Sequence, residues 1–172
     1  MTARSHTLPR SATRFTGDAG AAALLAGTAA LTFFTTGAGM LEGHAVYPSW
    51  YDLAAFPDFA GYHARFGAAL LPWLPAPLLL ATLLNGVLVV KRPAGVPGWL
   101  PVATLLGQVF VIGVTLSQAL PLQAQLATPG HTPSEIFALL DRLIQLNWWR
   151  EVPGLAVASG FVVMLTHAMS RR

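Results

Sequence analysis

The residues of this 172-residue chain whose types can do chemistry stand at the ends of long apolar stretches. They comprise a carboxylate, two imidazoles, an amide and two guanidinium groups: Glu42, His44, His63, Asn147, Arg65 and Arg150. An imidazole exchanges protons near neutral pH, and ionisable groups within a membrane segment are functional candidates by default. Asn147 and Arg150 are three residues apart, so on a helix they share a face. The set predicts acid–base chemistry on a bound molecule, with His44 and His63 as the candidate bases.

The same residues also have explanations that need no catalysis. An ion pair of Glu42 with Arg150 or with Arg65 would tie two helices together, and histidines are common at a membrane interface. Glu42, His44 and His63 could instead supply a carboxylate and two imidazoles to a metal or haem. The chain has no cysteine, which excludes disulfides, iron–sulfur clusters and thiolate metal sites. The cofactor stays undetermined: we expect none, with a metal or haem as the alternative.

Four apolar stretches must position these residues. The chain is 54% apolar and 10% charged, against roughly 25% charged in an ordinary soluble domain. Stretches without Asp, Glu, Lys or Arg reach about the 20 residues that a membrane helix needs. They cover residues 19–41, 66–90, about 98–120 and 152–169. The sequence predicts an all-α fold, an integral membrane four-helix bundle, within residues 19–169.

Positive charge predicts how the bundle is oriented. Basic residues concentrate in the tail 1–18, in the short connection with Lys91 and Arg92, and in the tail 170–172. Such segments stay on the cytoplasmic side, so we expect both termini there, in a multi-pass protein of the cytoplasmic membrane. Because Lys and Arg lie at segment ends rather than on one face, we expect no nucleic-acid partner. The lipid bilayer is the predicted surrounding.

The second outer connection predicts an additional amphipathic helix over about residues 133–149. Thr132 and Glu135 have the spacing of a capping box, and Pro133 suits the first helical position. We expect this helix to lie on the membrane or to dock over the bundle. Pro153 then predicts a kink or a fresh start for the fourth span.

Small and polar residues recur at helical spacing within the spans and predict which faces turn inward. One face of the first span carries Thr28, Thr32, Thr35, Gly39 and Glu42; one face of the third carries Thr104, Gln108, Thr115 and Gln118; the second adds Thr82 and Asn85. These stripes predict either packing between helices or the lining of a substrate cavity. Pro72, Pro75 and Pro77 predict irregular backbone, which at that depth must be buried in protein or face a cavity.

Several stretches of the chain resemble a known family. They are Gly39–Trp50 (GMLEGHAVYPSW), Tyr62–Phe66 (YHARF), the run Pro121–Gln125 (PLQAQ) and Ile136–Arg150, which ends in LNWWR. Together with the spacing of the spans, they resemble small four-span bacterial membrane proteins grouped with anthrone oxygenases. The resemblance implies oxygen-dependent oxidation of an anthrone-type aromatic to a quinone, without an evident metal or flavin. The positions at stake are Glu42, His44, Tyr47, His63, Asn147, Trp148 and Arg150. The chain departs from the pattern at Glu151–Pro153, where the family leads us to expect a Thr and further apolar residues.

These observations support hypotheses of different classes. In the first, a membrane oxidoreductase takes a hydrophobic aromatic or quinone-like molecule from the lipid and deprotonates it, while Asn147 and Arg150 stabilise the oxyanion. Candidate substrate contacts are Tyr47, Trp50, Trp148, Gln108 and Gln118. In the second, the chain is a non-enzymatic subunit or chaperone that binds a membrane partner protein through its outer helix. A small-solute carrier built as a homo-oligomer is the weakest hypothesis.

Overall fold

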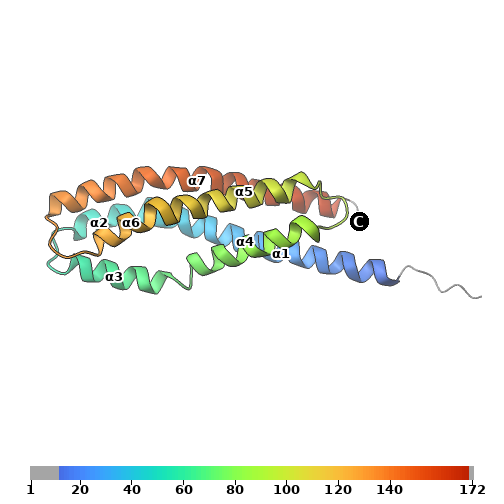
Figure 1. The fold of residues 1–172 in the computed structure, drawn as a ribbon, viewed down its shortest axis with the longest axis horizontal. Helices are drawn as coiled ribbons and strands as arrows, with labels where there is room; N and C mark the ends of the chain where they lie inside the picture. The colour runs from blue at the N-terminus through green and yellow to red at the C-terminus, as the bar shows by residue number, and fades with distance from the viewer. Residues whose placement is uncertain (1–11, 171–172) are drawn as a thin grey trace, which may run out of the picture.

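The computed structural model describes residues 12–170, with side chains from residue 19 onward. Every regular element in this range is a helix (Figure 1). In chain order these are α1 (Ala12–Leu41), the π-helix η1 (Glu42–Val46), α2 (Tyr47–Leu53), α3 (Phe59–Leu70), α4 (Pro75–Val90), α5 (Trp99–Val114), the π-helix η2 (Thr115–Ala119), α6 (Leu120–Leu126) and α7 (Pro133–Met169).

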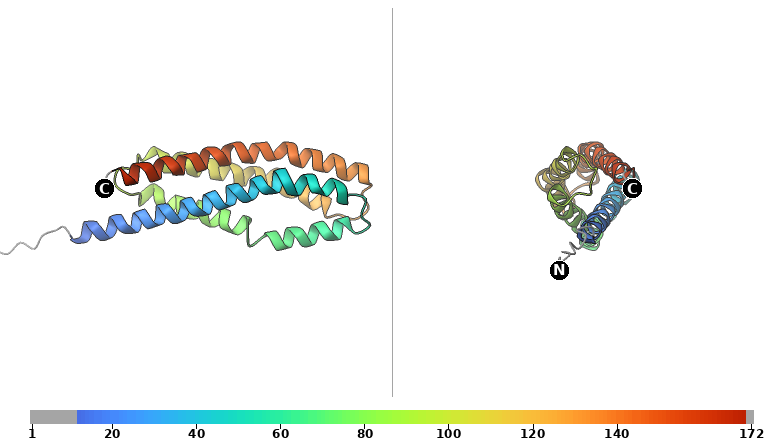
Figure 2. Two further views of the ribbon diagram at one scale, coloured as in Figure 1. Left: turned by 180° about the vertical axis from the view of Figure 1, so that it is seen from behind. Right: turned by 90° about the vertical axis from the view of Figure 1, so that its right-hand side faces the viewer.

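The helices form four long rods that pack side by side. Within the described residues, four helical stretches are long and apolar enough to cross a membrane: Ala19–Leu53, Phe59–Val90, Trp99–Leu126 and Pro133–Met169. Viewed end-on, the four rods surround a common axis (Figure 2). The predicted all-α, four-span membrane bundle is therefore confirmed.

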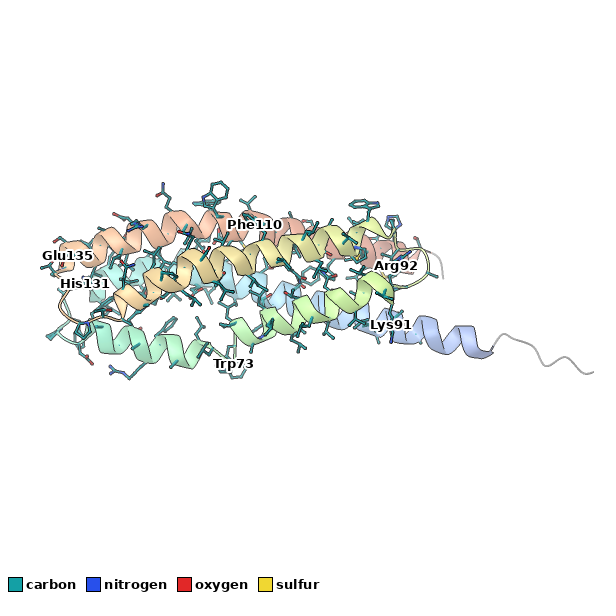
Figure 3. All side chains as sticks on the ribbon, viewed as in Figure 1. Trp73, Lys91, Arg92, Phe110, His131 and Glu135 are labelled. Atoms are coloured by element: carbon teal, nitrogen blue, oxygen red, sulfur yellow. The ribbon has the colours of Figure 1, made fainter. Side chains whose placement is uncertain are left out.

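The rods are longer than a bilayer is thick. At 1.5 Å per residue, α7 runs for about 55 Å, whereas the hydrocarbon layer is about 30 Å thick. Trp149 lies twenty residues before Met169, the end of α7, which corresponds to about 30 Å. The exposed rings of Trp148 and Trp149, with Trp73 from the break between α3 and α4, suit one membrane interface, and exposed Trp99 suits the other. The bundle therefore extends beyond the hydrocarbon at the end that carries Glu135, opposite Lys91 and Arg92 (Figure 3).

Each half of the bundle has a core of its own. In the half that ends at Glu135, the buried residues are Tyr47, Trp50, Ala54, Phe59, Ala119, Leu122, Leu126, Ile136, Leu139, Leu140 and Leu143. In the half that ends at Lys91, they are Leu25, Ala29, Leu88, Val96, Leu100, Val157, Phe161 and Met164. The projecting half exposes Asp52, Arg65, Asp141 and Arg142, as expected for a surface in water.

The predicted helix at 133–149 exists, but it is not a separate element. Its capping box is present: the Thr132 amide donates to Glu135 Oε2 at 2.7 Å, and Thr132 Oγ1 accepts from the Glu135 amide at 3.4 Å. The helix then continues through Pro153 to Met169 without a fresh start, and its apolar face is buried inside the bundle rather than on a membrane surface. Proline costs a helix one hydrogen bond, and packing on both sides of Pro153 holds the helix together.

The boundaries of the first and second spans also differ from those predicted. Helix α1 begins at Ala12, so the end of the predicted tail 1–18 is helical; residues 1–11 and 171–172, with most of the tail arginines, lie outside the described residues. The predicted second span divides at residues 71–74, where α3 ends and α4 begins. The irregular backbone expected from the prolines is thus present.

Both π-helices are followed closely by a proline. Segment η1 ends at Val46, two residues before Pro48, and η2 ends at Ala119, two residues before Pro121. A proline ring inside an α-helix clashes with the carbonyl four residues earlier, and a wider turn relieves this clash. A π-helical turn contains more residues than an α-helical turn. The side chains after each π-helix therefore face other directions than an unbroken α-helix would give them.

Candidate active site

A cavity of about 340 Å³ lies midway along the bundle, between all four rods. Its wall is mainly apolar, with threonines from α1 and η2 and with Gln108 on α5. Three polar side chains of α7 stand on one side of it: Asn147, Arg150 and Glu151. The break between α3 and α4 contributes Leu71, Leu74 and Pro75, as expected for irregular backbone at this depth.

The cavity opens sideways. Leu71 and Leu79 line it from one side of a gap, and Leu116 and Leu120 line it from η2 and α6. All four side chains are also exposed on the outer surface, by about half: 58%, 54%, 59% and 48%. Residues that line a cavity and also face the surroundings mark its mouth. These four residues therefore mark a lateral mouth, and one of them, Leu71, is close in the chain to exposed Trp73.

Arg150 provides a buried positive charge beside the cavity. Its Nη2 lies 3.6 Å from Oε2 of Glu42, and the two side chains are 13% and 7% exposed. Its Nη1 donates to the hydroxyl of Tyr47 at 3.5 Å, while Nε has no partner among the described residues. Of the two predicted ion pairs of Glu42, the one with Arg150 forms. Arg65 pairs instead with Asp58 on the surface.

Glu151 is the carboxylate of the cavity, and the sequence-based candidates did not include it. Asn147 Nδ2 donates to its Oε1 at 2.5 Å, and His44 Nε2 lies 2.9 Å from its Oε2. Asn147 and Glu151 are four residues apart, so they stack along one face of α7. Two sequence signals pointed to Glu151: its spacing of four residues from Asn147, and the departure from the family pattern at Glu151–Pro153.

Gly43 in η1 is what allows α7 to come this close. A Cβ atom at Gly43 would lie 1.8 Å from Nδ2 of Asn147 and 2.8 Å from Oε1 of Glu151. Glycine therefore leaves room for the two α7 side chains against the backbone of the first rod. The π-helix also places Glu42 inward and His44 outward within a single turn.

His44 stands at the surface end of this cluster. Its side chain is 55% exposed while that of its partner Glu151 is 6% exposed. Its ring lies 6.0 Å from the Trp148 ring in an edge-to-face arrangement. Trp148 is itself exposed and does not line the cavity, so it does not serve there as a stacking surface. His44 reaches the cavity only through Glu151.

Tyr47, Trp50 and His63 belong to the core of the projecting half. Tyr47 and Trp50 are fully buried, His63 is 2% exposed, and the rings of Trp50 and His63 lie 4.5 Å apart. None of the three lines the cavity. The base and stacking roles predicted for His63 and Trp50 would require a path that the packed core does not offer. Tyr47 contacts the site through Arg150, and Gln123, a residue that sequence reasoning missed, donates to its hydroxyl at 3.2 Å.

An amide network closes the cavity toward the Lys91 end. Asn85 donates to Gln108 Oε1 at 2.8 Å and to Thr104 Oγ1 at 3.1 Å, and Gln108 donates to Thr32 Oγ1 at 3.2 Å. Gln108 also lines the cavity, as predicted for a substrate contact. Gln118, predicted on the same face, is exposed, because η2 interrupts the α-helical repeat between the two glutamines.

The predicted metal ligands do not come together. Glu42 pairs with Arg150, His44 contacts Glu151, and His63 packs among aromatic rings. Among the described side chains, no three His, Asp or Glu residues form a group that could hold a metal ion. The arrangement instead offers a guanidinium, an amide and a carboxylate beside an apolar cavity. Comparisons with protein-family models, curated proteins and solved structures find no match to this chain.

Proposed function

We propose that this protein is a membrane oxidoreductase that oxidises a hydrophobic aromatic molecule of the anthrone class with molecular oxygen. The substrate enters from the lipid through the mouth between Leu71 and Leu116 and occupies the cavity. The apolar wall suits fused aromatic rings, and a volume of about 340 Å³ is within the range of small-molecule sites.

One observation carries the proposal: Arg150 and Glu151 face the same cavity, and each has a different charge partner. Glu42 balances Arg150 at 3.6 Å, which leaves the Glu151 carboxylate to act as a base. The unpartnered Nε of Arg150 is a buried donor. A guanidinium donor next to a carboxylate base is the equipment for removing a proton beside a carbonyl and stabilising the resulting oxyanion.

The proposed reaction begins at a ring CH₂ group that is conjugated to a carbonyl. Glu151 takes one proton from this carbon, and the electron pair moves onto the carbonyl oxygen, which accepts hydrogen bonds from Arg150 and Asn147. The anion then reacts with oxygen. Overall the CH₂ group becomes C=O, one oxygen atom enters the product, and the other leaves as water with the two hydrogens. Oxygen is the oxidant, so the balance needs no further reductant.

We further propose the cytoplasmic membrane of a bacterium, with both termini on the cytoplasmic side. Lys91 and Arg92 flank the short connection at one end of the bundle, whereas Asp52, Asp58 and Glu135 lie at the other. This asymmetry supports the orientation through the positive-inside tendency. The cavity mouth and the His44–Glu151 pair then lie toward the outer leaflet.

The test is oxygen consumption by the protein in lipid nanodiscs with an anthrone as substrate. We expect one oxygen consumed for each quinone formed. Glu151→Gln should lower kcat by at least about a hundredfold, the usual contribution of a general base. Asp52→Asn, the same chemical change at an exposed position, is the matched control and should leave the rate unchanged. Wild-type protein that consumes no more oxygen than empty nanodiscs would refute the proposal.

The alternative is a non-enzymatic subunit or chaperone that binds a partner protein. The apolar face of α7 between Ile136 and Leu143 is buried within the chain's own core, so it is not available to a partner. A partner would have to use another surface, such as the exposed Phe137 or Trp149. Retention of one membrane protein through purification, lost in a Phe137→Ser/Trp149→Ser variant, would favour this alternative.

A further inference from the structure

His44 connects the cavity to the membrane interface. Its partner Glu151 lines the cavity and is 6% exposed, whereas His44 is 55% exposed and does not line the cavity. The 2.9 Å contact between His44 Nε2 and Glu151 Oε2 thus joins an enclosed carboxylate to an open imidazole. The adjacent exposed ring of Trp148 places the imidazole at the depth of the lipid headgroups.

From this geometry we propose that His44 is a proton carrier, which transfers protons between Glu151 in the cavity and water in the headgroup region. The proposal deepens the proposed function, since a base that takes a proton from each substrate molecule must lose that proton before the next turnover. Elsewhere Glu151 contacts Asn147, and an amide side chain does not carry protons at neutral pH.

The charges around the pair fit a group that exchanges protons. Arg150 precedes Glu151 on α7, and it contacts Glu42 and Tyr47 of the first rod. Glu42 and Arg150 neutralise each other, and the tyrosine hydroxyl accepts from Arg150. The proposed proton path therefore runs between Glu151 and His44, separate from the Arg150–Glu42 pair.

The transfer balances without any other reactant. The O–H bond of protonated Glu151 breaks and an N–H bond forms at His44 Nε2. The imidazolium then releases the proton on Nδ1 to interfacial water, which leaves a neutral ring and a carboxylate. When the exposed ring turns away from Glu151, exchange of its ring protons with interfacial water restores the starting tautomer. Gly43 has a supporting role, since a side chain there would push Asn147 and Glu151 away from the first rod.

The experiment follows the protonation of Glu151 by infrared spectroscopy on the protein in nanodiscs after a rapid pH change, with no substrate added. The carboxylic acid C=O band of Glu151 is identified by its loss in Glu151→Gln. We compare wild type with His44→Ala and with His44→Gln, which keeps an amide donor to Glu151 but cannot carry a proton. His167→Ala, an exposed histidine at the other end of α7, is the matched control.

We expect the protonation of Glu151 after the pH change to be at least about tenfold slower in both His44 variants than in wild type. This factor is within the range that a positioned acid–base group contributes. The control should respond as wild type does, and added imidazole should restore the rate of His44→Ala. A wild-type rate in His44→Gln, no acceleration by imidazole, or no Glu151 band at any pH would overturn the proposal. Because substrate is absent, a failure to consume oxygen would refute the enzyme and leave this result standing.

Discussion

Arg150 of α7 lies 3.6 Å from Glu42 of η1, and both side chains are almost fully buried where the first and fourth rods meet the cavity. This contact pairs the buried guanidinium with one of the two carboxylates near the cavity. With Glu42 satisfied by Arg150, the second carboxylate, Glu151, is free to pair with a histidine that reaches the surface. One cavity is thus bordered by the Arg150–Glu42 pair and by the separate Glu151–His44 pair.

Removing one member of the Arg150–Glu42 ion pair should lower the free energy of unfolding more than replacing both members. Arg150→Met leaves the Glu42 carboxylate buried without its partner, and Glu42→Gln leaves the guanidinium unbalanced, so each should destabilise the protein by about 3–5 kcal/mol. The double variant should be more stable than either single variant, because no unpaired charge remains. Thermal unfolding in detergent measures the four proteins. A double variant as unstable as the sum of the singles would show that the two charges are not coupled.

Gly43 should not tolerate a methyl group. Its Cβ would lie 1.8 Å from Nδ2 of Asn147, so Gly43→Ala must displace Asn147 and weaken its bond to Glu151. We expect a loss of about 1–3 kcal/mol in stability, together with lower oxygen uptake. Gly37→Ala is the control: no atom lies within 4 Å of its Cβ position, and alanine is the better helix former. Equal effects of the two substitutions would contradict the close approach of α7.

A larger side chain at the lateral mouth of the cavity should slow the entry of substrate. Leu116 lines the cavity and is 59% exposed, so Leu116→Trp should narrow the mouth and lower kcat/KM several-fold. Leu106 is exposed on α5 but does not line the cavity, so Leu106→Trp should have no such effect. Steady-state oxygen uptake over a range of anthrone concentrations distinguishes the two. If Leu106→Trp were as impaired as Leu116→Trp, entry through this mouth would be ruled out.

The predicted orientation can be tested directly because the chain has no cysteine. Ala94→Cys lies in the connection between α4 and α5, and Ala55→Cys in the connection between α2 and α3. A membrane-impermeant maleimide added to intact cells should label position 55 only, and position 94 should react after permeabilisation. The reverse pattern would place both termini on the outer side and the cavity mouth in the inner leaflet.

Much of the fold was predictable from the sequence, because its signals are local. Apolar length predicted the four rods, the Thr132–Glu135 spacing predicted the start of α7, and three prolines predicted the break after Leu70. The inward positions of Thr32, Asn85 and Gln108 followed from the helical repeat. Each of these features depends on residues within a few turns of one another.

The parts of the site that the sequence did not reveal depend on two π-helices and on contacts between distant segments. In the third rod, the π-helix η2 before Pro121 shifts which residues face the bundle interior. Gln118 is therefore exposed, and Gln123 reaches Tyr47 inside. In the first rod, Glu42 and His44 both lie in the π-helix η1 before Pro48, and they contact different residues: Arg150 and Glu151. Glu151 lies two residues before Pro153, where a kink or a fresh start of the span was predicted, so its place on the same helix face as Asn147 did not follow from the sequence. His63 is buried beside Phe59 of its own helix and Trp50 of α2, and the contact with Trp50 depends on packing between separate helices.

The most direct test of the proposed site is an experimental structure of the protein bound to an anthraquinone, the product class of the proposed reaction. We predict planar density within the cavity, with one carbonyl oxygen about 3 Å from the guanidinium of Arg150 and the ring edge facing Glu151. Density for the quinone elsewhere on the protein, or a cavity that stays empty at saturating quinone, would contradict the account.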